Sequence, residues 1–367
     1  MATLSQIALT FIPRLGPTAI RRLMEAYPGE DIFSLPRQEL KAAFGSHIGI
    51  IESISSKSGH ARAEQELAFC EKNGIRPLFF TDSDFPERLN RPECGDSPVL
   101  LYVMGRADLN AERTVSVVGT RRATAQGRDN TDRLVRDLRA YNTPIVSGLA
   151  YGIDTAAHTA ALDHGLPTVA VLGHGLDRIY PPENRPLAKR IIDAGGALLT
   201  EYPSDTAINP RYFPARNRII AALADATIVV EASEKGGALI TAAIAASYQR
   251  DVFALPGRLT DTYSRGCNNL IATNRAQLLR TADDIAFQLG WPLIGKQMAI
   301  AEAEEAAALS PTEQKVIDLL QEHDRMTLDE VAARLAASLP KAAGLMFNLE
   351  MRGLVHTLPG HLYQASR

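Results

Sequence analysis

Short apolar runs alternate with helix-length stretches through the middle of this chain, and this alternation restricts the fold more than any other feature. Eight runs have the length and β-branched content of buried strands, at 77–80, 99–103, 115–118, 144–146, 168–172, 197–199, 227–230 and 252–255. Helical stretches lie between most of them, for example at 127–140, 154–163 and 238–248. This order predicts an α/β protein with a doubly wound, mostly parallel sheet, which binds ligands beyond the carboxyl ends of its strands.

The alternating core occupies residues 66–291, and the pattern changes on both sides of it. Residues 1–65 predict short helices at 4–11, 18–26 and 38–43, separated by Gly and Pro. Residues 292–310 are rich in Ala and Glu and predict a linker or an exposed helix. In residues 311–367, the capping boxes Ser310-x-x-Glu313 and Thr327-x-x-Glu330 open two helices, and a third helix at 340–351 precedes a hairpin. Three helices and a hairpin predict a winged helix.

Both ends of the chain have a motif that binds DNA in other proteins. Residues 12–23 resemble a helix-hairpin-helix, whose turn presents backbone amides to phosphate, but Arg14 stands where that motif usually has its first glycine. Phosphate binding and a purely structural role both stay open there. The winged segment has six basic and seven acidic residues over 311–367, and its third helix offers only Lys341 and Arg352. We therefore favour a protein-contact or regulatory role for that segment.

Charge and cysteine content restrict the class of protein. The net charge of −3 argues against a uniformly basic surface, so any nucleic-acid site has to be a local patch. Three cysteines, Cys70, Cys94 and Cys267, stand far apart without metal or disulfide spacing, which fits a reducing cytosol. No window approaches the ~20 apolar residues of a membrane span, and no signal-peptide core follows the N-terminus. We expect a cytoplasmic protein with no membrane contact.

Four glycine loops follow predicted strands and supply the candidate binding residues. Each loop offers free amides and a helix N-terminus, which together form the usual anion site of an open α/β sheet. Several such sites along one sheet edge suit a row of phosphates. The candidates in three of these loops are Gly119, Thr120, Arg121 and Arg122 after the third run, Ser147 and Gly148 after the fourth, and Lys235, Gly236, Gly237 and Thr241 after the seventh.

A cluster of arginines and aromatic rings precedes the seventh run. Residues 209–220 read NPRYFPARNRII, with Arg211, Phe213, Arg216, Asn217 and Arg218 as candidates. Guanidinium groups hold phosphates and rings offer stacking faces, the pairing that single-stranded nucleic acid requires. A solvated ion-pair network before a helix is an equally common reason for such a cluster.

The usual cofactor and catalytic motifs are missing from the sequence. It contains neither G-x-x-x-x-G-K-[ST] nor a G-x-G-x-x-G after the first strands, and Ser147-Gly148 lacks the G-x-S-x-G frame of a nucleophile elbow. Asp154 and His158 lie one helical turn apart without a third ligand at metal spacing, so a hydrogen bond or ion pair is the favoured reading. We expect no catalytic residues, no cofactor and no metal.

Four long segments resemble the DNA-processing protein A family, also called DprA or Smf. They are SGLAYGIDTAAHTAAL (147–162), VLGHGLDRIYPPEN (171–184), FPARNRIIAAL (213–223) and GGALITAAIAASYQRDVFALPG (236–257), followed by GCNNLI at 266–271. The resemblance covers essentially the whole chain. It implies a SAM-like helical N-domain, an extended Rossmann core and a winged-helix tail. It further implies a non-catalytic protein that binds single-stranded DNA, dimerises through the core and loads RecA recombinase during natural transformation.

Three family motifs carry over to positions of this sequence. The G-S-R loop falls on Gly119, Thr120 and Arg121, and F-P-x-R-N-R falls on residues 213–218, with Arg211 as the basic residue before it. The S-G-[SA]-L-I-T-A motif falls on residues 236–242, where glycine replaces serine at position 236. That change removes a hydroxyl contact and leaves Lys235 as the substitute. Asp154 and Glu231 are expected to orient arginines, and Asn217 to fix a loop.

Two other classes of function compete with this interpretation. Rossmann-type phosphoribohydrolases, which cleave nucleoside monophosphates, use a similar paired-glycine helix start with a catalytic glutamate. The stretch Gly236-Gly237-x-x-x-Thr241 lacks their P-G-G-x-G-T-x-x-E form. A purely protein-binding adaptor is the third class, and it would show no salt-sensitive affinity for DNA.

Overall fold

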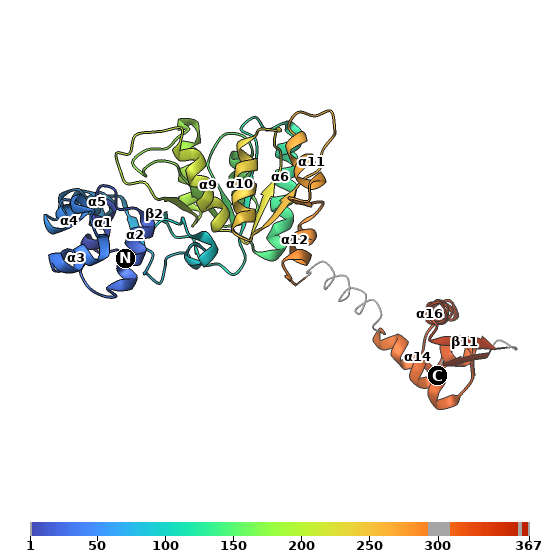
Figure 1. Ribbon diagram of the computed structural model, residues 1–367. Helices are drawn as coiled ribbons and strands as arrows, with labels where there is room; N and C mark the ends of the chain where they lie inside the picture. Colours follow the sequence, from blue (N-terminus) through green and yellow to red (C-terminus); the bar gives the residue numbers. More distant parts are fainter. Residues whose placement is uncertain (1, 293–308, 359–361, 366–367) are drawn as a thin grey trace. The chain divides into compact units, whose positions relative to one another are not determined.

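The computed structural model describes residues 2–292, 309–358 and 362–365, which fall into two compact units, Met1–Pro292 and Leu293–Arg367 (Figure 1). Most of the linker expected at 292–310 lies outside the described residues. Among the described residues, no helix has the length and apolar content needed to cross a membrane.

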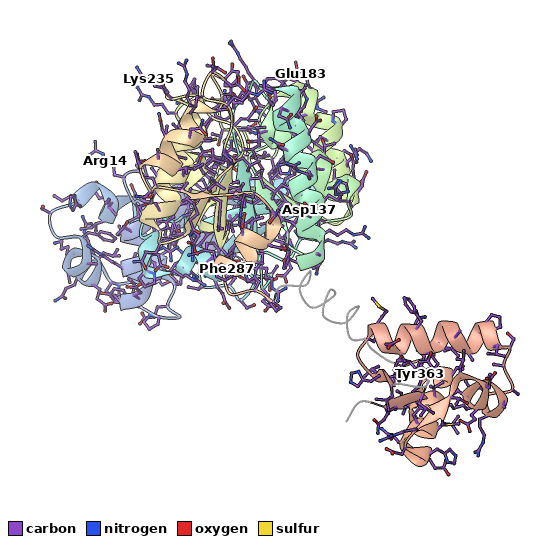
Figure 2. The ribbon with its side chains drawn as sticks, turned by 90° about the vertical axis from the view of Figure 1, so that its right-hand side faces the viewer. Arg14, Asp137, Glu183, Lys235, Phe287 and Tyr363 are labelled. Carbon is purple, nitrogen blue, oxygen red and sulfur yellow. The ribbon has the colours of Figure 1, made fainter. Side chains whose placement is uncertain are left out.

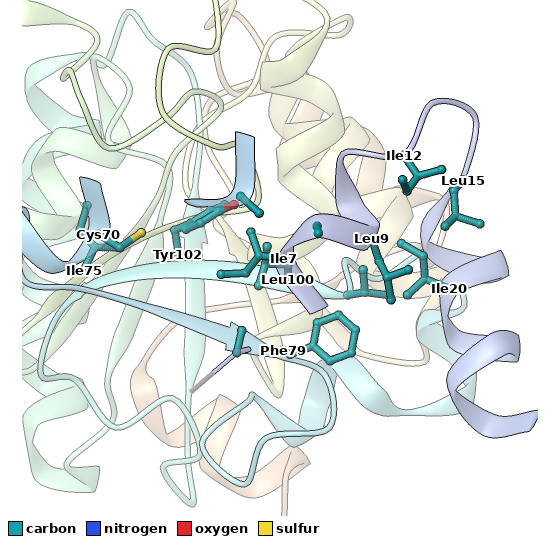
Figure 3. Close-up of a cluster of buried hydrophobic side chains, with 14 of the residues drawn as sticks. Ile7, Leu9, Ile12, Leu15, Ile20, Cys70, Ile75, Phe79, Leu100 and Tyr102 are labelled. Carbon is teal, nitrogen blue, oxygen red and sulfur yellow. The ribbon is translucent and has the colours of Figure 1, made fainter. Parts of the chain in front are cut away.

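The first unit begins with five helices, α1 (Leu4–Thr10), α2 (Pro17–Ala26), α3 (Arg37–Phe44), α4 (Ile48–Ser55) and α5 (His60–Asn73). Their apolar faces share one core with the edge of the sheet, where Ile7, Leu9 and Ile20 belong to the same buried cluster as Phe79 and Leu100 (Figure 3). The boundary that we drew after residue 65 falls inside α5. The α1–α2 turn has Arg14 at φ 66°, the left-handed conformation that glycine favours.

A nine-stranded sheet among the described residues forms the centre of the first unit, in the order β1-β2-β6-β5-β4-β3-β7-β8-β9. Its strands are β1 (Ile75–Phe79), β2 (Leu100–Gly105), β3 (Val115–Val118), β4 (Ile145–Ser147), β5 (Thr168–Val171), β6 (Ala197–Thr200), β7 (Ala226–Val229), β8 (Asp251–Ala254) and β9 (Gln277–Leu278). Neighbours from β6 to β9 in this order are parallel, whereas β2 is antiparallel to both β1 and β6. The predicted doubly wound, mostly parallel sheet is confirmed.

Helices cover both faces of this sheet. One layer contains α6 (Ala125–Leu138), α7 (Ile153–Asp163) and α8 (Arg185–Asp193), and the other contains α9 (Tyr212–Ala222) and α10 (Gly237–Ser247), which pack against each other (Figure 2). Two further helices, α11 (Arg265–Ala272) and α12 (Ala282–Gln288), follow β8 and β9. Because every β-to-α loop leaves a parallel strand at its carboxyl end, the glycine loops lie along one edge of the sheet.

The second unit has the predicted winged-helix elements. Its helices are α14 (Pro311–His323), α15 (Leu328–Arg334) and α16 (Leu339–Met351), and its sheet has the order β10 (Met326–Thr327), β12 (Leu362–Ala365), β11 (Val355–Leu358). Both expected capping boxes form: the Ser310 and Thr327 side chains accept from the backbone of Glu313 and Glu330, and each glutamate accepts in return. Val316, Leu320, Val331, Met346 and Leu349 fill its core.

Candidate nucleic-acid interface

A pocket of about 250 Å³ lies where the loops after β3 and β7 diverge. The chain runs from β3 to β6 on one side of β3 and then returns to β7 on the other side, so this is the switch point of the sheet. Nine of the sequence candidates line the pocket: Gly119, Thr120, Arg121, Phe213, Arg216, Asn217, Gly236, Gly237 and Thr241. These nine residues come from three sequence segments, and Ala150 and Asp154 add a fourth to the lining.

The N-terminus of α10 forms one wall of this pocket. Gly236 is the N-cap and has no side-chain capping bond, and the first turn of α10 carries no Asp or Glu. Gly237 and Ala238, which follow the cap, line the pocket. The amides at the start of a helix have no intrahelical partner and bear the positive end of the helix dipole. This wall is suited to an anion such as phosphate.

Arg121 and Phe213 also line this pocket. Arg121 is exposed, and its guanidinium carbon lies 5.6 Å from the centre of the Phe213 ring. The half-buried Phe213 ring also packs at 5.5 Å against Tyr180, with an interplanar angle of 42°. A cation over an aromatic face is attracted by the ring's quadrupole, so the two side chains hold each other in place. Arg121 is the candidate cation that is both exposed and in the pocket.

Arg216 also lines the pocket and is 3% exposed. Its Nη1 donates to Gly148 O at 2.7 Å and to Val171 O, which ties the loop after β4 to the end of β5. Burial lowers the pKa of Arg216 to about 10, and the opposite charge of Asp154 acts against that shift. Burial likewise raises the pKa of Asp154, against the attraction of Arg216. The guanidinium is therefore a buried cation that joins segments around the pocket, and its Nε has no hydrogen-bond partner among the described residues.

Two glycines leave space for close contacts at the site, Gly148 beside Arg216 and Asp154 and Gly152 beside the Thr120 backbone. A Cβ at Gly148 would lie 2.7 Å from both Nη atoms of Arg216 and from Asp154 Oδ2. Gly152 has φ 80°, and a Cβ there would lie 2.2 Å from Thr120 O. Gly148 thus serves the site by leaving space for the guanidinium, without lining the pocket itself.

Five other candidates also lie outside the pocket lining. Arg218 makes two bonds to Glu201, at 2.9 and 2.7 Å, and lies 3.8 Å from Asp96. The Ser147 hydroxyl is buried and donates to Val117 O at 2.7 Å. Lys235 is exposed and lines a separate depression between α10 and α11, while Arg122 and Arg211 are exposed.

The acidic residues have different partners. Asp154 faces Arg216, as the sequence suggested, and its Oδ2 accepts from the Ala150 amide at 3.3 Å. Glu231 instead accepts from the Thr124 amide at 3.0 Å and from its hydroxyl at 2.5 Å. It thereby fixes the end of the loop after β3 that leads into α6, and it pairs with no arginine of the residues that the structure describes. Thr124 in turn caps α6.

Tyr180 and Ile240 belong to the surroundings of the site and were missed by the sequence analysis. Tyr180 packs on Phe213, and Ile240 lines the pocket from the first turn of α10. Ile240 lies one helical turn after Gly237, so helical periodicity would have found it. Tyr180 comes from a loop, where no periodicity operates.

Comparisons with known proteins show the family of this chain. Residues 76–290 match the family described as DNA recombination-mediator protein A, and residues 301–361 match the DprA winged helix domain. The chain belongs to the DprA/Smf family. Protein Smf of Synechocystis is 34% identical over 98% of this chain and 97% of its own length.

Two solved DprA structures share the fold. DNA processing protein A of Streptococcus pneumoniae has a TM-score of 0.65 and 34% identity, and the match covers 77% of this chain and 97% of that chain. DNA processing protein A of Helicobacter pylori has a TM-score of 0.52 and 32% identity, covering 59% of this chain and 95% of that chain. The Helicobacter structure is described by its single-stranded DNA binding mode. The resemblance to the DprA/Smf family is thereby confirmed.

Proposed function

We propose that this chain is a non-catalytic recombination mediator that binds single-stranded DNA at the pocket between β3 and β7. One observation carries the proposal: an uncapped helix N-terminus, an exposed arginine and an aromatic ring meet in a single pocket. Amides and a guanidinium bind phosphate without reading sequence, and a ring stacks on any base. Membership of the DprA/Smf family and the single-stranded DNA binding of the Helicobacter relative support it.

A hydrolase function finds little support in the same pocket. Among the described residues that line it, Asp154 supplies the carboxylate, and this group is buried opposite Arg216. Glu231 is bonded to Thr124 and is not among the lining residues. A phosphoribohydrolase needs a carboxylate free to act on its substrate. We therefore assign the pocket to binding.

The test is a side-by-side titration of the protein with a labelled single-stranded oligonucleotide, the matching duplex and a nucleoside monophosphate, with base release assayed in parallel. The proposal predicts the tightest binding for the single strand, with little sequence preference, and no base release. Equal affinity for the blunt duplex would refute the pocket assignment. Release of base from the nucleoside monophosphate would support the phosphoribohydrolase function instead.

The family further supports a homodimer formed through the Rossmann core and delivery of the bound strand to RecA recombinase during natural transformation. Both steps belong to the proposal. Light scattering on the purified protein tests the dimer. The rate of RecA filament formation on a strand precoated with this protein tests delivery, and an unchanged or slower rate than on bare DNA would remove loading from the proposal.

A further inference from the structure

Two exposed tyrosine rings stand beside the pocket without a role in its lining. Tyr151 is 43% exposed and Tyr180 is 39% exposed. Tyr151 lies in the loop after β4 and Tyr180 in the loop after β5, so both occupy the sheet edge that carries the pocket. Exposed aromatic rings gathered at a binding edge point to a ligand with flat apolar faces.

Tyr180 contacts Phe213 directly, and Tyr151 is bonded to the segment that follows Tyr180. Tyr180 packs on Phe213 with 5.5 Å between ring centres. A hydrogen bond to Glu183, three residues after Tyr180, holds the Tyr151 ring beside the loop after β5 and is the main cause of the raised pKa of Tyr151. That bond, from the Tyr151 hydroxyl to Glu183 Oε2, is 2.5 Å long. Arg121, Phe213 and Tyr180 thus contact one another in turn, and Tyr151 stands on the neighbouring loop of the same edge.

Hydrogen bonds hold both tyrosine loops in place. The Tyr180 amide donates to Nε2 of the buried His174 at 3.3 Å, and His174 Nδ1 donates to Gly175 O at 2.9 Å. The buried Asn184 donates to Leu149 O at 2.8 Å and thereby joins the loop after β5 to the loop after β4. Rings on loops that are already ordered lose little entropy when a ligand stacks on them.

A second pair of tyrosines differs from Tyr151 and Tyr180 because its two rings stack on each other. Tyr202 and Tyr212 stack on each other with 4.4 Å between centres and an interplanar angle of 25°, and both are half-buried. Each of these rings already covers a face of the other. The exposed pair, Tyr151 and Tyr180, is therefore the one able to accept a flat ligand.

We propose that Tyr180 and Tyr151 extend the single-strand site beyond Phe213, each offering a face to one base of the same strand. This inference rests on the proposed function. A base sandwiched between two rings needs about 7 Å, twice the optimal carbon–carbon contact distance. The 5.5 Å between Phe213 and Tyr180 is too short for that, so the bases stack on the outward faces of the rings. We call this row of Phe213, Tyr180 and Tyr151 the aromatic track.

The track carries little free positive charge. Arg178, which lies close to Tyr180 in sequence, is paired with Asp177 at 2.5 Å, and Glu183 adds a negative charge beside Tyr151. Stacking releases no counterions, whereas each phosphate contact does. Loss of the track should consequently lower affinity without changing the salt dependence of binding, unlike loss of Arg121.

The experiment measures the affinity of full-length protein for oligothymidylates of increasing length, at several salt concentrations. In wild type, affinity should rise with each added nucleotide until the track is filled. The double variant Tyr151→Leu with Tyr180→Leu should lose that rise, roughly 5- to 150-fold for each base that no longer stacks, with an unchanged salt slope. An unaltered rise with length in the double variant overturns the inference.

Two control variants show whether a loss of affinity comes from the aromatic faces of Tyr151 and Tyr180. Tyr180→Phe keeps the aromatic face and should bind as wild type does. Phe287→Leu removes a ring that is 76% exposed at the opposite end of the first unit from Glu183 and Lys235, and should also leave binding unchanged (Figure 2). If wild type itself binds no oligonucleotide, the proposed function fails; if wild type binds and the double variant matches it, only the track fails.

A second measurement needs no substitution. A strand carrying photoreactive iodouracil, crosslinked to wild-type protein and mapped by mass spectrometry, should label Tyr180 and Tyr151. Crosslinks at Phe213 with none at either tyrosine would contradict the track while leaving the pocket intact.

Discussion

Arg216 and Arg121 stand close together in the pocket but differ in burial. The sequence suggested that both hold phosphate, but Arg216 is 3% exposed and bonds two carbonyls, whereas Arg121 is exposed. A buried guanidinium opposite a buried carboxylate contributes mainly to the folded state, because removing it leaves the partner charge uncompensated. The residue type alone does not distinguish these roles; burial does.

Arg216→Ala should therefore lower the free energy of unfolding by about 3–5 kcal/mol, since Asp154 and two carbonyls lose their partner. Urea denaturation measures the change. Arg121→Ala is the matched control, expected within about 0.5 kcal/mol of wild type. An Arg216→Ala protein with wild-type stability and no DNA binding would place the guanidinium on the phosphate instead.

His158 makes stability depend on pH. The Thr168 hydroxyl donates to Ile145 O, so His158 Nδ1–H donates to Thr168, and within the described part of the chain the buried Nε2 has no partner. Burial, assisted by Arg216, lowers the pKa of His158 to about 3. Because the unfolded chain binds this proton near pH 6.5, the neutral ring contributes fully above that pH, and its contribution falls as pH drops from 6.5 toward 3.

Wild type should accordingly lose about 2 kcal/mol of unfolding free energy between pH 7 and pH 5 relative to His158→Asn, whose side chain does not titrate there. Urea denaturation of both proteins at the two pH values gives the comparison. Parallel pH profiles for the pair would show that the ring is protonated in the folded state.

At the scale of the element, α9 explains which candidates reach the pocket. Phe213, Arg216, Asn217 and Ile220 are spaced i, i+3, i+4 and i+7, so they share one face of the helix and all line the pocket. Arg218 falls on another face and pairs with Glu201. Helical spacing applied to the sequence would have separated these two arginines.

A substitution at the N-terminus of α10 should raise stability and lower DNA affinity. A Cβ at Gly237 meets nothing within 4 Å. Gly237→Glu should raise the unfolding free energy by about 0.5–1 kcal/mol, because the helix gains a better former and an acid at its positive end. The same charge should repel phosphate and weaken single-strand binding.

Gly237→Gln is the uncharged control for this test. It keeps the gain in helix propensity and should lose much less affinity for single-stranded DNA. Thermal melting and an oligonucleotide titration report the two effects. Undiminished binding by the glutamate variant would show that phosphate does not approach this helix.

The sequence predicted the strands and capped helices well, for local reasons. Buried parallel strands are short apolar runs, and the capping boxes at Ser310 and Thr327 show where helices begin. Helices α4 and α5 and the edge strand β9 were not predicted. The two exposed residues of β9 carry no apolar run, and the Arg216–Gly148 contact joins residues 68 apart, which no local pattern records.

At the scale of the whole molecule, the first unit contains every residue that lines the pocket. Ending the chain at Pro292 should keep most single-strand affinity, because the winged segment has no basic surplus to bind phosphate. Oligonucleotide titration of the shortened protein checks this, with its melting transition as the control for folding. A folded but non-binding product would assign DNA contact to the winged unit.

We expect DNA phosphate to contact both the N-terminus of α10 and Arg121, and the salt dependence of single-strand affinity tests this contact most directly. Arg121→Ala should bind more weakly than wild type and flatten the slope of log affinity against log salt by about 0.7, one phosphate contact. Arg136→Ala, which removes an exposed arginine of α6 paired with Asp137, should leave both unchanged. Wild-type affinity and slope in Arg121→Ala would contradict the account and place the strand elsewhere.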